Sequence, residues 1–208
     1  MICFKSISRA VIFPALVGYI LFPAALARAQ KPSPAEVIAR HLDAIGTAKA
    51  RAAITTRIIS GTAQVIFRTT PAGQAIGKAV LASENTRQLL GMSFPSPVYP
   101  REQLTFNGVG FTAAFATPGN RSVLGNFLMT NDVVFKQGLM CGVLSAGWPL
   151  LRSPPRDASI DYVGTRKIDG ILLHELRYTP RGNSDLKITL YFDAGSFRHV
   201  RTEYDRVV

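Results

Sequence analysis

The segment Leu186-Lys187-Ile188-Thr189-Leu190-Tyr191-Phe192 decides the fold class of this chain. Every second residue from Leu186 to Phe192 is a large apolar side chain, and polar or amphipathic side chains stand between them. Successive side chains of a β-strand point to opposite faces of the sheet. This period of two therefore predicts a strand that lays one face on a hydrophobic core.

Segments of the same kind, joined by short turns, lie on both sides of this strand. Asp169-Gly170, Glu84-Asn85 and Asn107-Gly108 separate pairs of them, and Asn-Gly is the strongest two-residue hairpin signal in the chain. In chain order, the predicted strands are residues 59–67, 78–83, 86–93, 103–106, 109–115, 158–166, 171–179, 186–192 and 197–204. About nine or ten such strands predict an antiparallel meander that is long enough to curl on itself.

One helix is expected before the first strand. Ser33 is the expected N-cap, Pro34 suits the first helical position, and Glu36 completes a capping box. Apolar residues recur at helical spacing as far as Ile45, and Gly46 supplies the C-terminal stop. The helix has one apolar stripe and is expected to pack on the sheet.

A helical insert is expected between the fifth and sixth strands. Between Ser122 and Leu151 only Asp132 and Lys136 are charged. Ser122 can cap one short helix, and Asn131 or Asp132 can cap a second that carries Phe135 and the apolar residues after it. Such an insert either plugs the concave side of the sheet permanently or forms a lid over a cavity. The predicted fold class is α+β, a curved antiparallel sheet (an unclosed β-barrel) with the N-terminal helix and this insert covering its concave face.

The first 29 residues have the pattern of an export signal. Lys5 and Arg9 precede an apolar run, and Ala27-Arg28-Ala29 has the small-x-small form of a cleavage site. We expect residues 1–29 to be a signal peptide and residues 30–208 a single periplasmic domain that begins at Gln30. A retained transmembrane anchor is the alternative.

The predicted mature chain is basic. Removing residues 1–29 lowers the formal net charge from +11 to +8. This charge favours anionic partners such as a membrane surface, although it also fits a basic face that is simply solvated. Because the chain is predicted to be exported, nucleic acid is not expected as a partner.

Three segments resemble the LolA/LolB-like outer-membrane lipoprotein-sorting proteins. These segments are residues 34–46, residues 167–176 with Lys167-Ile168-Asp169-Gly170 and His174-Glu175-Leu176, and residues 190–204. The resemblance implies an unclosed β-barrel lidded by helices, with an apolar cavity that holds acyl chains. Carriers of this kind hold the lid with an arginine near the cavity mouth, and the sequence does not identify its equivalent here.

The apolar side chains expected around this cavity lie on strands and on the insert. Gly61 and Ala63 are small residues on the inward face, and they leave space there unless the insert fills it. The predicted lining consists of Val65, Phe67, Phe106, Phe111, Phe115, Phe127, Phe135, Leu139, Met140 and Val143. An ordinary filled core built from the same residues is the alternative.

The titratable residues do not form a recognisable catalytic or metal-binding motif. His41, His174 and His199 share no local metal-ligand spacing, so we expect no metal and no cofactor. His41 and His174 are expected to face the core, His199 to be solvated, and Cys141 to be an inert buried thiol.

The sequence thus predicts a monomeric periplasmic carrier for a lipid or an acylated protein, without enzymatic activity. Two alternatives remain open at this stage. One is a structural or assembly factor of the cell envelope with a filled core. The other is a secreted hydrolase whose catalytic groups are brought together by the fold.

Overall fold

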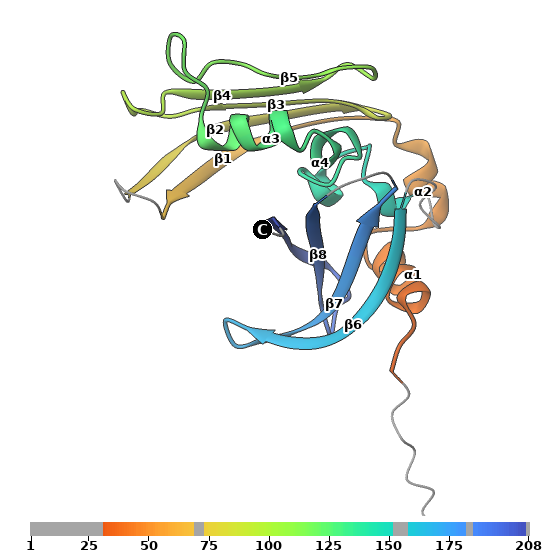
Figure 1. Cartoon of the computed structure of the whole chain (residues 1–208). Coiled ribbons are helices and arrows are strands. Elements are labelled where there is room, and N and C mark those ends of the chain that lie inside the picture. Colours follow the sequence, from red (N-terminus) through yellow and green to blue (C-terminus); the bar gives the residue numbers. More distant parts are fainter. Residues whose placement is uncertain (1–30, 69–72, 152–157, 182–184, 207–208) are drawn as a thin grey trace, which may run out of the picture. The chain divides into compact units, whose positions relative to one another are not determined.

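The computed structural model describes residues 31–68, 73–151, 158–181 and 185–206 (Figure 1). The predicted signal peptide, its cleavage site and Gln30 lie outside the described residues. Within these ranges, no helix is long and apolar enough to cross a membrane.

The N-terminal helix α1 (Pro34–Ala44) begins as predicted. The Ser33 hydroxyl accepts a hydrogen bond from the Glu36 amide at 3.1 Å. The Glu36 carboxylate binds Arg40 at 2.9 Å, one turn further along the helix, so only the serine half of the capping box is present. A second helix, α2 (Ala48–Ala53), follows with Thr47 as its N-cap, and the sequence analysis missed it.

The strands form two antiparallel sheets. The first sheet has five strands in the order β1-β2-β3-β4-β5, and the second has four in the order β6-β7-β8-β9. The strands of the first sheet are β1 (Thr56–Phe67), β2 (Gly73–Glu84), β3 (Arg87–Ser93), β4 (Arg101–Phe106) and β5 (Phe111–Ala113). Those of the second are β6 (Ala158–Ile168), β7 (Ile171–Pro180), β8 (Leu186–Asp193) and β9 (His199–Arg206). The α+β class and the unclosed antiparallel architecture are therefore confirmed.

Two of the three predicted hairpin turns have the expected length. Asn85 and Asp169 adopt left-handed backbone angles (φ 51° and 50°), which reverse the chain within two residues. The third hairpin differs, because Phe106 pairs with Phe111 and the connection is four residues long. The Asn107 side chain accepts hydrogen bonds from the Val109 and Gly110 amides at 2.9 Å each, which stabilises the longer turn.

The insert between β5 and β6 contains α3 (Val123–Thr130), α4 (Val133–Lys136) and the 3-10 turns η1 (Gly142–Leu144) and η2 (Pro149–Leu151). The Ser122 hydroxyl caps α3 as predicted, accepting from the Gly125 amide at 2.7 Å. The predicted second helix is much shorter than expected. Gly138 has φ +74°, and a Cβ there would lie 2.2 Å from the Gly147 carbonyl oxygen, so the backbone leaves the helical path.

The insert joins the two sheets. Gln88 of β3 donates a hydrogen bond to the Phe135 carbonyl at 2.9 Å, and the Tyr178 hydroxyl of β7 donates to the Gln137 side chain at 2.9 Å. Figure 1 shows α4 between the sheets. The buried core that forms around it contains, among others, Leu104, Phe106, Leu128, Phe135, Leu139, Trp148, Leu150, Leu176, Tyr178, Ile188, Leu190 and Phe192. The two sheets and the insert between them therefore share this core. A second, smaller cluster of Phe94, Tyr99 and Ala116 lies against Val65 and Phe67 of β1.

Candidate functional site

An apolar pocket lies where the end of β1, the start of α3 and the strand β9 meet. Its volume is about 440 Å³, within the range of small-molecule sites in proteins. We name it the acyl pocket after the ligand that we propose for it, and its walls are Val65, Ile66, Phe67, Arg68, Tyr99, Ser122, Val123, Leu124, Phe127 and Tyr204.

The strand side of the acyl pocket follows from the alternation of β1. Val65 and Phe67 are half-buried and share one face of the strand with Ala63. The Phe67 ring meets the Tyr99 ring edge-on with centroids 5.4 Å apart, and Phe94 packs on Tyr99 at 5.1 Å. These aromatic contacts hold the Phe67 side chain in position at the strand side of the pocket.

The helical side of the acyl pocket follows from the spacing along α3. Gly125 and Leu128 are buried against the core, whereas Leu124 and Phe127 are only half-buried. Val123 is 77% exposed at the rim. A half-buried apolar row beside a fully buried one leaves hydrophobic surface available to a ligand.

A buried carboxylate anchors this corner of the fold. Glu102 is 1% exposed, and it accepts hydrogen bonds from the Tyr99 hydroxyl at 2.7 Å and from the Ser122 hydroxyl. Burial and the neighbouring carboxylate raise the pKa of Tyr99. Because Ser122 also caps α3, Glu102 ties the β3–β4 connection to the start of the helix. The sequence analysis missed it, since a single glutamate on a strand gives no signal.

The structure divides the predicted lining residues among four places. Val65, Phe67 and Phe127 lie together on the acyl pocket. Phe106, Phe135 and Leu139 are buried in the core, and Phe111 and Met140 pack against it. Val143 lines a different pocket, and Phe115 is 45% exposed under the Arg121 guanidinium at 4.8 Å from its centroid.

His41 is a core histidine, as predicted. It is fully buried, its Nδ1 hydrogen-bonds the Phe197 carbonyl oxygen at 3.0 Å, and its Nε2 accepts from the Trp148 indole N–H at 3.2 Å. Both ring nitrogens therefore have partners in the neutral form. Burial lowers the pKa of His41.

The prediction that His199 is solvated is wrong. A β-bulge between Tyr191 and Phe192 pairs His199 with Phe192, so its ring turns toward the core and lies 4.9 Å from that of Trp148. Burial, followed by the nearby His41, lowers the pKa of His199 to about 4. His174 is half-buried, hydrogen-bonds the Tyr162 hydroxyl at 3.1 Å and stacks on Phe197.

The remaining chemistry is sparse. Cys141 is partly buried, and burial raises the pKa of its thiol to about 12, which leaves it protonated at neutral pH. Across the ranges that the structure describes, no group of three or more His, Cys, Asp or Glu side chains is placed to hold a metal ion.

No protein-family model matches the chain, and no curated protein matches its sequence. Solved structures that are similar in fold include a putative outer membrane lipoprotein-sorting protein domain from Vibrio parahaemolyticus, at 11% identity and a TM-score of 0.45, over 81% of this chain and 73% of that one. Another is a LolA superfamily protein from Nitrosomonas europaea, at 12% identity and a TM-score of 0.41, over 85% and 73% of the two chains. A DUF1329 family protein from Desulfovibrio piger is similar at 11% identity and a TM-score of 0.40, over 82% and 73%.

Proposed function

We propose that this chain is an exported, non-enzymatic carrier that binds a lipid or an acylated protein through the acyl pocket. The observation that supports the proposal best is the pocket itself, about 440 Å³ in volume, in which half-buried Val65, Phe67 and Phe127 converge from β1 and α3. Each methylene moved from water into such a pocket contributes about 0.8 kcal/mol. A chain of about a dozen carbons therefore gains roughly 10 kcal/mol before the costs of association.

The export signal, the mature domain and the basic surface each have a role in such a carrier. Residues 1–29 direct export to the periplasm and are removed, and residues 30–208 act as one monomeric domain. The basic surface brings the protein to anionic membranes, from which an acyl chain is taken up or to which it is delivered.

Placing a charge on the helical wall of the pocket should abolish acyl binding. In Phe127→Asp a carboxylate faces the site. An acyl chain that enters the pocket then removes water from this charge and offers it no hydrogen-bond partner, which is costly. We expect the affinity for a fluorescent C12 fatty-acid probe to fall by at least about a hundredfold, or about 2.7 kcal/mol. Fluorescence titration measures it, and circular dichroism shows that the variant is folded.

Met129→Asp is the matched control, because Met129 lies on the same helix and is 43% exposed outside the pocket lining. It should bind the probe like the wild type. Equal loss in both variants, or no saturable binding by the wild type, would refute the acyl pocket.

The second candidate, an envelope assembly factor with a filled core, is favoured by one observation. Phe135 and Leu150 are fully buried and Trp148 is 1% exposed, so the middle of the insert is packed as a core element. A wild type that never binds the acyl probe, with the same buried insert, would support this alternative.

A further inference from the structure

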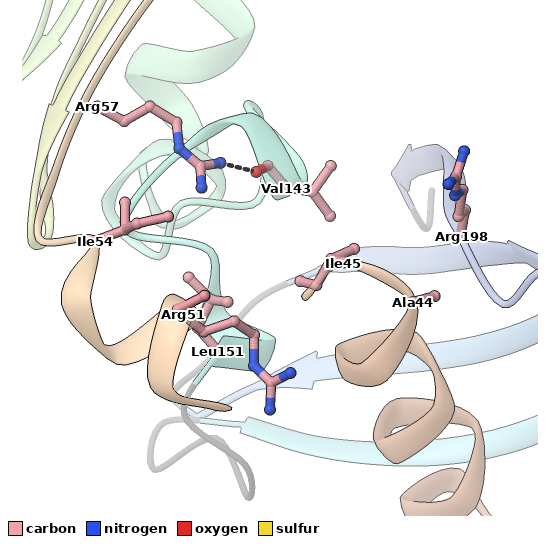
Figure 2. A pocket seen from close by; sticks show the side chains of 9 residues that line it. Ala44, Ile45, Arg51, Ile54, Arg57, Val143, Leu151 and Arg198 are labelled. Carbon is pink, nitrogen blue, oxygen red and sulfur yellow. Dashed lines mark hydrogen bonds between the residues drawn. The ribbon is translucent and has the colours of Figure 1, made fainter. Parts of the chain in front are cut away.

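A second pocket lies at the opposite end of β1 from the acyl pocket, and arginines surround it (Figure 2). Its volume is about 310 Å³. We call it the arginine pocket, and its lining consists of Ala44, Ile45, Ala50, Arg51, Ile54, Arg57, Val143, Leu151 and Arg198. Three of these side chains are cationic, and no acidic residue is among them.

Two of the three guanidinium groups are held in place by backbone carbonyls. Nη1 of Arg51 donates to the Leu42 carbonyl at 2.6 Å and to the Gly46 carbonyl. Nη1 of Arg57 donates to the Val143 carbonyl at 2.5 Å, as Figure 2 shows. A guanidinium carries five N–H donors, so these contacts orient each group while its Nε and Nη2 donors are not used by them.

No acidic side chain in the lining of the arginine pocket neutralises its positive charge. Arg51 and Arg57 are half-buried, and Arg198 is exposed at the rim. Asp43 lies on α1 beside the lining residue Ala44, but it is exposed and is not part of the lining. Arg51 occupies the carbonyl end of α1. Figure 2 shows the three arginines on different sides of the pocket, and like charges placed around a pocket raise the local potential and attract an anion.

The residue types that line the arginine pocket favour one class of anion, a phosphate ester. A planar guanidinium binds phosphate oxygens through paired N–H donors, and several around one site match a group with several anionic oxygens. The other walls are apolar, with Ile45, Ile54 and Leu151 among them. A hydrated inorganic ion makes little use of such walls, whereas a phosphate ester that carries carbon atoms fills them.

We propose that the arginine pocket binds a phosphate ester, with the phosphate attracted by the combined charge of Arg51, Arg57 and Arg198 and the organic part against the apolar walls. The arginine pocket shares no residue with the acyl pocket. The site therefore does not depend on acyl binding, and either site can fail its test while the other passes.

Isothermal titration calorimetry at low ionic strength tests the site on the full mature chain. Three ligands are compared: inorganic phosphate, glycerol 1-phosphate, and a dihexanoyl phosphatidylglycerol below its critical micelle concentration. We expect saturable binding of both esters, with inorganic phosphate at least about tenfold weaker. The two esters are also compared in Phe127→Asp, whose acyl pocket is disabled. There, stronger binding of the phosphatidylglycerol would identify a lipid headgroup as the source of the phosphate, and equal affinity would identify a soluble phosphate ester.

Arg198→Gln is the main variant, because Arg198 is exposed and its loss leaves the fold intact. It should weaken ester binding at least about tenfold, and Arg57→Gln should do the same. Arg177→Gln is the matched control, since Arg177 is an exposed arginine on β7 and removes the same net charge. Phe127→Asp should bind glycerol 1-phosphate, which has no acyl chain, like the wild type. Equal affinities in Arg198→Gln and Arg177→Gln, or no saturable binding by the wild type, would overturn the proposal.

Discussion

Replacing Phe135 with aspartate should collapse the thermal stability of the protein. Phe135 is fully buried, its ring packs on Phe111 with centroids 5.1 Å apart, and its backbone carbonyl accepts from Gln88. Losing a buried phenylalanine costs about 3–5 kcal/mol, and leaving an unpaired charge in its place costs several more. The total is comparable to the roughly 5–15 kcal/mol that stabilise a domain.

We therefore expect Phe135→Asp to be unfolded at room temperature or to melt far below the wild type, as followed by circular dichroism. Phe115→Asp is the matched control, because Phe115 is 45% exposed and lies beside Arg121, which can pair with the new carboxylate. It should melt close to the wild type. A nearly unchanged melt of Phe135→Asp would mean that the middle of the insert swings into solvent, as the lid hypothesis requires.

Acidification should destabilise the protein well above the pH at which carboxylates are protonated. His41 and His199 flank Trp148 in the core, and burial lowers the pKa of both below the ordinary 6.5. A histidine with a lowered folded-state pKa is protonated first in the unfolded chain. Its contribution to stability is therefore full above pH 6.5 and is lost as the pH falls toward the folded pKa.

For His199, with a folded pKa of about 4, the loss between pH 6.5 and 4 is about 3 kcal/mol. His41 changes stability in the same direction. Urea unfolding at a series of pH values measures the free energy, which should be flat above pH 7 and fall steeply below 6.5.

The variant His199→Phe should flatten this slope, because it removes one of the titrating groups and keeps an aromatic ring against Trp148. His174→Phe is the comparison variant, because His174 packs on Tyr162 and Phe197 and not on Trp148, and it should retain the contributions of His41 and His199 to the slope. A His199→Phe variant with the full slope of the wild type would contradict the assignment.

The elements that follow from local signals could be predicted from the sequence. Ser33 and Ser122 cap helices where expected, and the turns at Asn85 and Asp169 reverse the chain as expected. In these cases a side chain or backbone preference within a few residues determines the conformation.

The features that depend on distant contacts could not be predicted in this way. The bulge in β8 and β9 turns His199 to the opposite face, and no residue type marks it. Tyr191 alternates with the core-facing Leu190 and Phe192 in the sequence, yet it is 1% exposed. Its hydroxyl accepts a hydrogen bond from Arg166 of β6 and donates one to Glu203 of β9. The helix α4 in the insert ends before Gly138, which adopts φ +74° and leaves no room for a Cβ beside the Gly147 carbonyl, a neighbour that only the folded chain brings near.

Only part of the candidate site could be predicted, because it too depends on contacts between distant segments. Large apolar residues at alternating positions identify an inward face, but they do not say whether a ligand or the chain itself covers it. The structure places Phe135 and Leu139 under other elements of the chain, and leaves Val65, Phe67 and Phe127 half-buried around a pocket.

Photo-crosslinking with a fatty acid that carries a diazirine near its methyl end tests the acyl pocket most directly. The mature protein is irradiated with the probe, digested, and the adducts are located by mass spectrometry. The account predicts adducts on residues 65–68 and 122–127, on Tyr99 or on Tyr204, and their loss when excess unlabelled fatty acid competes. Adducts that are absent, that do not compete, or that lie on other segments alone would contradict the central claim that the space between β1, α3 and β9 holds an acyl chain.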